Sequence, residues 1–132
     1  MKKQIILLIL FVWAAVQMNA ASKKLILFSP DKSLSIEASV IEGALTYNVK
    51  KNEATVIQSS RMGIKGDVDF SNVLRLKSVS KVKQVVAAYD APGEKRAHRS
   101  FVGNVAKIEL LNAANNKLIV EFKATNEGVA FR

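Results

Sequence analysis

Apolar and polar residues alternate along most of the chain with a period of two. Four apolar residues share one side of the clearest run: Leu34, Ile36, Ala38 and Val40. The same alternation recurs over residues 45–50, 107–110 and 117–122. Every second side chain of an extended strand faces the same way, and no stretch shows the 3.6-residue spacing of an amphipathic helix. The pattern predicts an all-β fold in which antiparallel strands are joined by short loops.

Turn-forming residues separate these runs. Residues 42–43 and 51–52 predict two hairpin turns, and residues 112–116 form an asparagine-rich link. A third turn is predicted around Asn126 and Gly128. There we expect Asn126 to adopt a left-handed backbone and Gly128, which lacks a Cβ atom, to help reverse the chain.

The sequence stops inside an apolar run, Val129–Arg132, without the polar residues that usually end a domain. We therefore expect an incomplete β-sandwich with a shortened last strand. Phe131 is expected in the core, and Arg132 is expected to pair with a group outside this chain.

Two regions are less regular. Residues 59–69 predict a loop or a short strand around Gly63, and residues 90–103 predict the longest polar loop, where function tends to lie. Between them we expect one long strand, from Val73 to about Ala88. Its two faces would be basic (Arg75, Lys77, Lys81, Lys83) and apolar (Leu74, Leu76, Val82, Val86).

The N-terminus predicts a signal peptide over residues 1–20. Lys2 and Lys3 precede an unbroken apolar run of twelve residues, Ile5–Val16. That length suits a signal core and is short of the ~20 residues that span a bilayer. Cleavage would leave a mature chain of residues 21–132, exported to the periplasm or the cell exterior, with no membrane span.

Composition excludes several kinds of site. The chain has no cysteine and one histidine. Disulfides, thiolate metal sites, cysteine nucleophiles and paired-histidine zinc sites are therefore absent. The net charge of +9 permits an anionic partner. Export and the lack of interleaved aromatics in the basic stretch argue against nucleic acid.

Three segments resemble the N-terminal domain of glycoside hydrolase family 97. They are F-S-P-D-K-S-L at 28–34, G-A-L-T-Y-N-V at 43–49 and F-K-A-T-N-E-G-V-A-F-R at 122–132. The family patterns are S-P-D-G-x-L, G-x-L-x-Y-x-V and F-R-x-Y-N-D-G-V-A-F-R-Y. Residues 89–96 resemble the family's polar loop more loosely. The chain departs from the family at Lys123, Thr125 and Glu127, which replace arginine, an aromatic residue and aspartate.

The resemblance implies a Bacteroides-type α-glucosidase or α-galactosidase. In such enzymes a β-sandwich like the galactose mutarotase super-sandwich packs on a catalytic (β/α)₈ barrel with a nearby calcium ion. The family's catalytic carboxyl groups and calcium ligands lie beyond Arg132. The resemblance therefore assigns no catalytic residue and no metal ligand to this chain, and it implies motif-based structural roles for Asn126, Gly128, Phe131 and Arg132.

Candidate carbohydrate-facing residues lie in the polar loop: Tyr89, Glu94, Arg96 and His98. Tyr89 and Phe101 bracket that loop, where they either stack on a sugar ring or anchor the strand ends. Asp67 and Asp69 form the closest carboxylate pair. Their Gly-flanked segment predicts solvated side chains rather than a sheltered catalytic pair or a calcium site, which needs further oxygen ligands.

The leading hypothesis is a non-catalytic N-terminal domain of an exported α-glycosidase, carbohydrate-facing and inactive alone. Its partners would be the catalytic barrel and an α-linked oligosaccharide. The main alternative is an independent secreted β-sandwich that binds glycans or a surface protein. A basic module that binds a polyanion is a third hypothesis.

Overall fold

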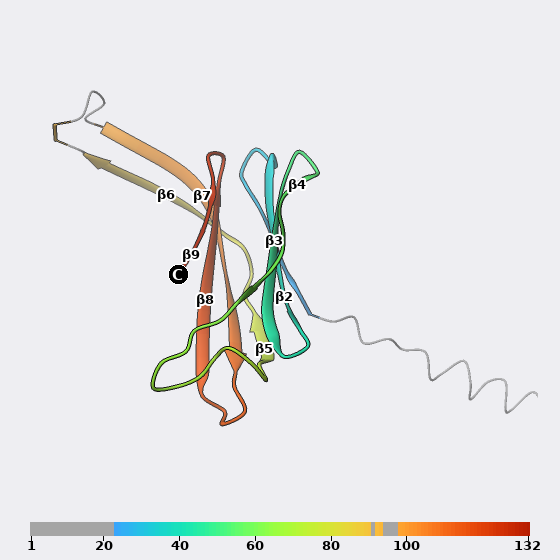
Figure 1. Cartoon of the computed structure of the whole chain (residues 1–132). Helices are drawn as coiled ribbons and strands as arrows, with labels where there is room; N and C mark the ends of the chain where they lie inside the picture. Colours follow the sequence, from blue (N-terminus) through green and yellow to red (C-terminus); the bar gives the residue numbers. More distant parts are fainter. Residues whose placement is uncertain (1–22, 91, 94–97) are drawn as a thin grey trace, which may run out of the picture.

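The computed structural model describes residues 23–90, 92–93 and 98–132. This part of the chain forms nine strands in two antiparallel sheets that pack face to face (Figure 1). The prediction of an all-β, antiparallel sandwich is confirmed.

The first sheet is a simple meander. Its strands are β1 (Leu25–Phe28), β2 (Leu34–Ile41), β3 (Ala44–Lys51) and β4 (Ala54–Met62), and they lie in that order. Consecutive strands that neighbour one another can be joined by very short turns. Short turns are therefore sufficient to connect the strands of the first sheet.

Both two-residue turns of this sheet have the left-handed backbone of a type I′ hairpin. Glu42 and Gly43 have φ angles of 50° and 75°, and Asn52 and Glu53 have φ angles of 48° and 68°. Type I′ turns match the twist of the flanking strands. The first turn lies where the sequence predicted it, and the second is centred one residue later.

The second sheet is built around the longest strand. β7 (His98–Leu111) pairs along one side with β8 (Lys117–Thr125), which pairs in turn with β9 (Val129–Phe131). On its other side β7 has two partners in succession. Its first half pairs with β6 (Lys83–Asp90), and its second half pairs with β5 (Arg75–Val79).

The core lies between the sheets and is made by the alternation seen in the sequence. Residues from both sheets form one buried cluster, which includes Leu25, Leu27, Ile36, Ala38, Leu45, Ala106, Ile108, Leu110, Val120 and Phe122. Each large apolar side chain removed from water contributes about 1.5–3 kcal/mol. This cluster is the main source of stability in a chain without disulfides.

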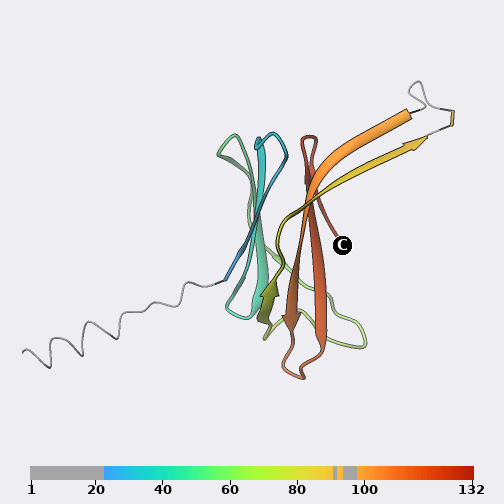
Figure 2. The same ribbon diagram turned by 180° about the vertical axis from the view of Figure 1, so that it is seen from behind.

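One part of the second sheet extends beyond the sandwich. β6 and the first residues of β7 form a two-stranded ribbon, called the arm here (residues 83–90 and 98–102). Figures 1 and 2 show from opposite sides that the arm projects past the ends of the other strands. None of its side chains that the structure describes is buried.

Three expectations about strand limits are wrong. The loop predicted over 90–103 is shorter, because β7 begins at His98. The single strand predicted from Val73 to Ala88 is two strands, β5 and β6. The break falls at Ser80, whose hydroxyl accepts a hydrogen bond from the Lys107 N–H at 2.8 Å. β4 continues to Met62, so the first four residues of the loop or short strand expected over 59–69 belong to a long strand.

Candidate functional site

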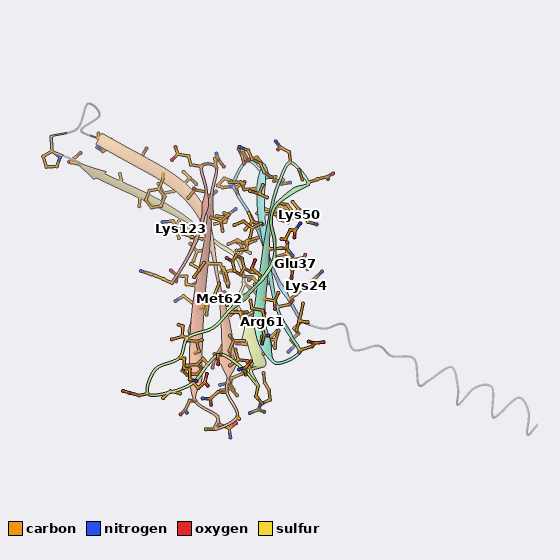
Figure 3. The ribbon with its side chains drawn as sticks, viewed as in Figure 1. Lys24, Glu37, Lys50, Arg61, Met62 and Lys123 are labelled. Atoms are coloured by element: carbon orange, nitrogen blue, oxygen red, sulfur yellow. The ribbon has the colours of Figure 1, made fainter. Side chains whose placement is uncertain are left out.

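An apolar groove opens between the sheets on the side where β4 and β9 lie. It has a volume of about 430 Å³. Its lining includes Tyr47, Met62, Ile64, Leu118, Val120 and Phe131. Arg61 and Met62, labelled in Figure 3, contribute from the end of β4. The groove is an opening into the side of the hydrophobic core.

Phe131 stands at the boundary between the core and the groove. Its ring centroid lies 5.9 Å from that of Tyr47 and 6.1 Å from that of Phe122, in tilted arrangements. Half of the side chain, 51%, remains exposed. The expectation that Phe131 belongs to the core is therefore only partly right, since one side of the ring packs on the core and the other faces the groove.

Arg132 pairs within the chain, against expectation. Its Nη2 lies 2.8 Å from Glu121 Oε1, and its backbone exchanges two hydrogen bonds with Glu121. Partial burial raises the pKa of the Glu121 carboxyl, but the cations of Lys107 and Arg132 outweigh it and hold the pKa below its usual range. Arg132 therefore fixes the last residues to β8.

Asn126 joins the two sheets. Its side-chain oxygen accepts a hydrogen bond from the Asp31 backbone N–H at 3.0 Å. Asp31 Oδ1 in turn accepts hydrogen bonds from the Ser29 hydroxyl at 2.7 Å and from the Ser33 N–H at 2.9 Å. These bonds, led by that from Ser29, lower the pKa of Asp31. Two segments that carry the family resemblance thus meet at one end of the sandwich.

The turn that carries Asn126 is closed by a threonine hydroxyl. Thr125 Oγ1 accepts hydrogen bonds from the N–H groups of Glu127 at 3.3 Å and Gly128 at 3.2 Å. Neither Asn126 nor Gly128 has a positive φ angle. The expected left-handed conformation of Asn126 is wrong, because Thr125 supplies the turn's hydrogen bonds without it.

Of the predicted carbohydrate-facing residues, the structure describes one side chain. His98 is the first residue of β7, and its Nδ1 lies 2.8 Å from Asp90 Oδ1 across the arm. Both side chains are exposed, at 71% and 80%. Tyr89 lies in β6 opposite Arg99, and its side chain is outside the described set. Glu94 and Arg96 lie outside the described residues. The sequence analysis did not identify Asp90 as the partner of His98.

Asp67 and Asp69 line a shallow depression of about 410 Å³. Asp69 Oδ1 accepts hydrogen bonds from the hydroxyl and the N–H of Ser71, and these lower its pKa. A catalytic general acid needs the opposite shift. Asp67 and Asp69 are both exposed, as the sequence predicted.

The predicted basic face is partly neutralised. Lys77 and Lys117 lie 2.9 Å and 3.1 Å from Glu109 Oε1, and their hydrogen bonds lower the pKa of Glu109. Arg75 binds the side-chain oxygen of Asn115. Of the four residues of the predicted basic face, Lys77 is thus paired with a carboxylate and Arg75 with a neutral amide oxygen.

Metal and membrane sites were also sought among the described residues. Within residues 23–90, 92–93 and 98–132, no three His, Cys, Asp or Glu side chains gather as a metal site would require. The same residues form no helix of the length and apolarity that a membrane span needs.

The two sheets define a β-sandwich domain with an apolar groove between them. The family model described as "Glycosyl-hydrolase 97 N-terminal" matches residues 27–132. The chain belongs to this family. None of the curated proteins compared with the chain matches it.

Solved structures show the same fold. A β-arabinopyranosidase is 27% identical, with a TM-score of 0.75. A glycoside hydrolase family 97 enzyme from Pseudoalteromonas sp. strain K8, solved in complexes with panose and with acarbose, is 22% identical, with a TM-score of 0.73. Each match covers 81% of this chain and 17% of the enzyme. The chain therefore spans about a sixth of the length of these relatives.

Proposed function

We propose that the chain is a non-catalytic supporting domain of an exported family 97 α-glycosidase and that it packs beside a catalytic (β/α)₈ barrel. The observation that carries this is the open groove, in which Phe131 keeps 51% of its side chain exposed. An apolar opening into a core is typical of a surface that another part of a protein covers.

The described carboxyl groups support a non-catalytic role. Glycoside hydrolysis needs two flanking carboxyl groups, one with a raised pKa. The described carboxyl groups whose pKa is shifted, Asp31, Asp69, Glu109 and Glu121, are all shifted downward. Each accepts hydrogen bonds from hydroxyl groups or from cations, which favour the ionised form.

The carbohydrate-facing part of the proposal concerns the tip of the arm. Tyr89, Glu94, Arg96 and His98 lie in or next to the segment that joins β6 to β7. Aromatic, charged and imidazole groups of this kind bind sugar rings and hydroxyls. An α-linked oligosaccharide is the proposed ligand, and residues 1–20 are the proposed signal that exports the domain.

The decisive experiment is an activity assay on purified residues 21–132 with aryl α-glucosides and α-galactosides. No turnover is expected. Turnover that is lost in the Asp67→Asn, Asp69→Asn double variant would contradict the proposal.

The sugar contact has its own test. Panose is added to isotope-labelled protein, and shifts are expected in the amide resonances around His98. Shifts that are confined to other surfaces, or that survive His98→Ala unchanged, would move the sugar contact away from the arm.

A further inference from the structure

Basic side chains gather on the outer face of the second sheet, which is called the cationic face here. Ala106, Ile108 and Leu110 of β7 face the core, so the odd-numbered residues of β7 and their partners in the neighbouring strands face outward. Two described side chains on this face are acidic, Glu109 and Glu121. Seven are basic: Arg75, Lys77, Lys83, Lys107, Lys117, Lys123 and Arg132.

The first carboxylate of this face lies beneath two lysines. Glu109 Oε1 is 2.9 Å from Lys77 Nζ and 3.1 Å from Lys117 Nζ. The glutamate side chain is 22% exposed, whereas the two lysine side chains are 49% and 52% exposed. Because two cations share one carboxylate, the group retains a positive charge, and that charge lies outermost.

The second carboxylate repeats this arrangement. Glu121 Oε2 is 3.4 Å from Lys107 Nζ, and Glu121 Oε1 is 2.8 Å from Arg132 Nη2. Glu121 is 19% exposed, and Lys107 and Arg132 are 57% and 84% exposed. The buried carboxylates hold these cations in place before any ligand arrives, which lowers the entropic cost of binding one.

A third pair of cations extends the array. Lys83 and Lys123 both lie opposite Val105, on either side of β7. Among the ion pairs of the described residues, none includes Lys83 or Lys123. The three groups of cations thus follow β7 at residues 109, 107 and 105, and successive rows lie about 7 Å apart.

Evenly spaced rows of cations suit a linear polyanion. The cations lie on the surface of a sheet and not on an element that enters a DNA groove. Single-stranded nucleic acid needs aromatic rings on which bases stack. Phe101 is the one aromatic ring among the described side chains of this face, and Lys123 Nζ lies over it, 3.7 Å from the ring centroid. A polysaccharide that carries anionic groups needs no stacking platform.

We propose that the cationic face binds an anionic polysaccharide, one that carries sulfate or carboxylate groups. The site goes beyond the proposed function, and only the choice of an extracellular polymer is supported by the export proposed there. Five of the seven cations are lysines, which bind anions as point charges. The face therefore recognises the spacing of charges along the polymer more than the identity of the sugar.

Matched polymers test the proposal. The full chain is purified from the cells that produce it and titrated calorimetrically with dextran sulfate, with unsulfated dextran of the same length and with polygalacturonate. At least one of the two anionic polymers is expected to bind, at least about tenfold more tightly than dextran. Its affinity should fall steeply between about 50 mM and 200 mM salt. Comparison of the two anionic polymers distinguishes sulfate from carboxylate recognition.

Paired variants locate the site. Lys83→Gln with Lys107→Gln should weaken binding of the anionic polymer about threefold to tenfold, the effect of two exposed ion pairs. Lys50→Gln with Lys51→Gln removes the same charge from the first sheet and should change the affinity less than about twofold. Lys83→Arg with Lys107→Arg keeps the charge and should restore the affinity, which separates loss of charge from loss of folding.

The outcomes separate this site from the proposed function. Equal binding of dextran and dextran sulfate would overturn the anionic site, and it would leave the proposed contact with α-linked glucans standing. Equal losses in the two glutamine double variants would show a general effect of net charge and overturn the site. Equal affinity for a single-stranded oligonucleotide would overturn the choice of a polysaccharide, and absence of binding to both anionic polymers would overturn the whole proposal.

Discussion

Asn126 accepts a hydrogen bond from the backbone N–H of Asp31 at 3.0 Å, across a sequence separation of 95 residues. The contact links the β1–β2 turn of one sheet to the β8–β9 turn of the other. Both residues lie in segments that resemble the family motifs. The link gives those motifs a shared structural role, which is to hold the ends of the two sheets together.

Asn126→Ala removes this link. We expect the free energy of unfolding to fall by about 0.5–1.5 kcal/mol, the typical contribution of one hydrogen bond. Urea denaturation of residues 21–132 measures the change. Gln58→Ala, at an exposed position of β4, is the control and should change stability less. Equal losses in the two variants would mean that the link between the turns contributes nothing.

Lys32→Gly should stabilise the fold. Lys32 has a φ angle of 61°, a left-handed conformation that costs most residues about 1–2 kcal/mol and costs glycine little. After the entropic cost of glycine in the unfolded chain, the expected gain is about 0.5–1 kcal/mol. Thermal unfolding measures it. Lys50→Gly places the same residue within β3 and should destabilise. A loss of stability in Lys32→Gly would show that the turn is not left-handed.

Gly43→Ala should destabilise the fold by more than about 1 kcal/mol, since it meets two costs. Gly43 has a φ angle of 75°, and an added Cβ atom would lie 3.0 Å from the Val73 backbone nitrogen. Gly128→Ala is the matched control, because a Cβ atom there meets nothing within 4 Å and its φ is not positive. Comparable effects at both glycines in urea denaturation would refute the close approach of Val73.

Glu109 makes stability depend on acid pH. Lys77 and then Lys117 lower its folded-state pKa below the ordinary value of 4.5. The ion pairs therefore stabilise the fold above pH 4.5, and this contribution is lost as the pH falls through the lower, folded-state pKa. Urea denaturation should be carried out at several pH values, from neutral pH into this acid range. The free energy of unfolding should fall less in Glu109→Gln than in the wild type. Salt at about 0.5 M should narrow the difference, and a difference unaffected by salt would argue against ion pairing.

The strands that could be predicted from the sequence are those with one face buried in the core. Alternation at Leu34–Val40 and Leu118–Phe122 reports burial directly, so β2 and β8 could be predicted from the sequence. The separation of β5 from β6 could not, since both strands pair with β7 and the break depends on a hydrogen bond between Ser80 and Lys107. The start of β7 at His98 was missed because the arm has no buried side to impose a pattern.

Only those residues of the candidate site that lie in the family motifs could be predicted from the sequence. The family pattern pointed to Asn126 and Phe131, but it did not give their partners, Asp31 and Tyr47, which lie far away in the sequence. The intrachain ion pair of Arg132 was missed for a related reason. Glu121 lies eleven residues earlier and comes into contact only through the pairing of β8 with β9.

β7 is one continuous strand in two environments. Between Ala106 and Leu110 its core-facing side chains are buried, whereas its described side chains between His98 and Val102 are not. Opening of the arm need not disturb the sandwich, so the backbone amides of a single strand should exchange with solvent through two different events. Backbone amides near Ile108 should exchange only through global unfolding, whereas those near Ser100 should exchange when the two strands of the arm separate locally. We therefore expect Gly103 to mark the boundary between a cooperative folding unit and a ribbon that opens independently of it.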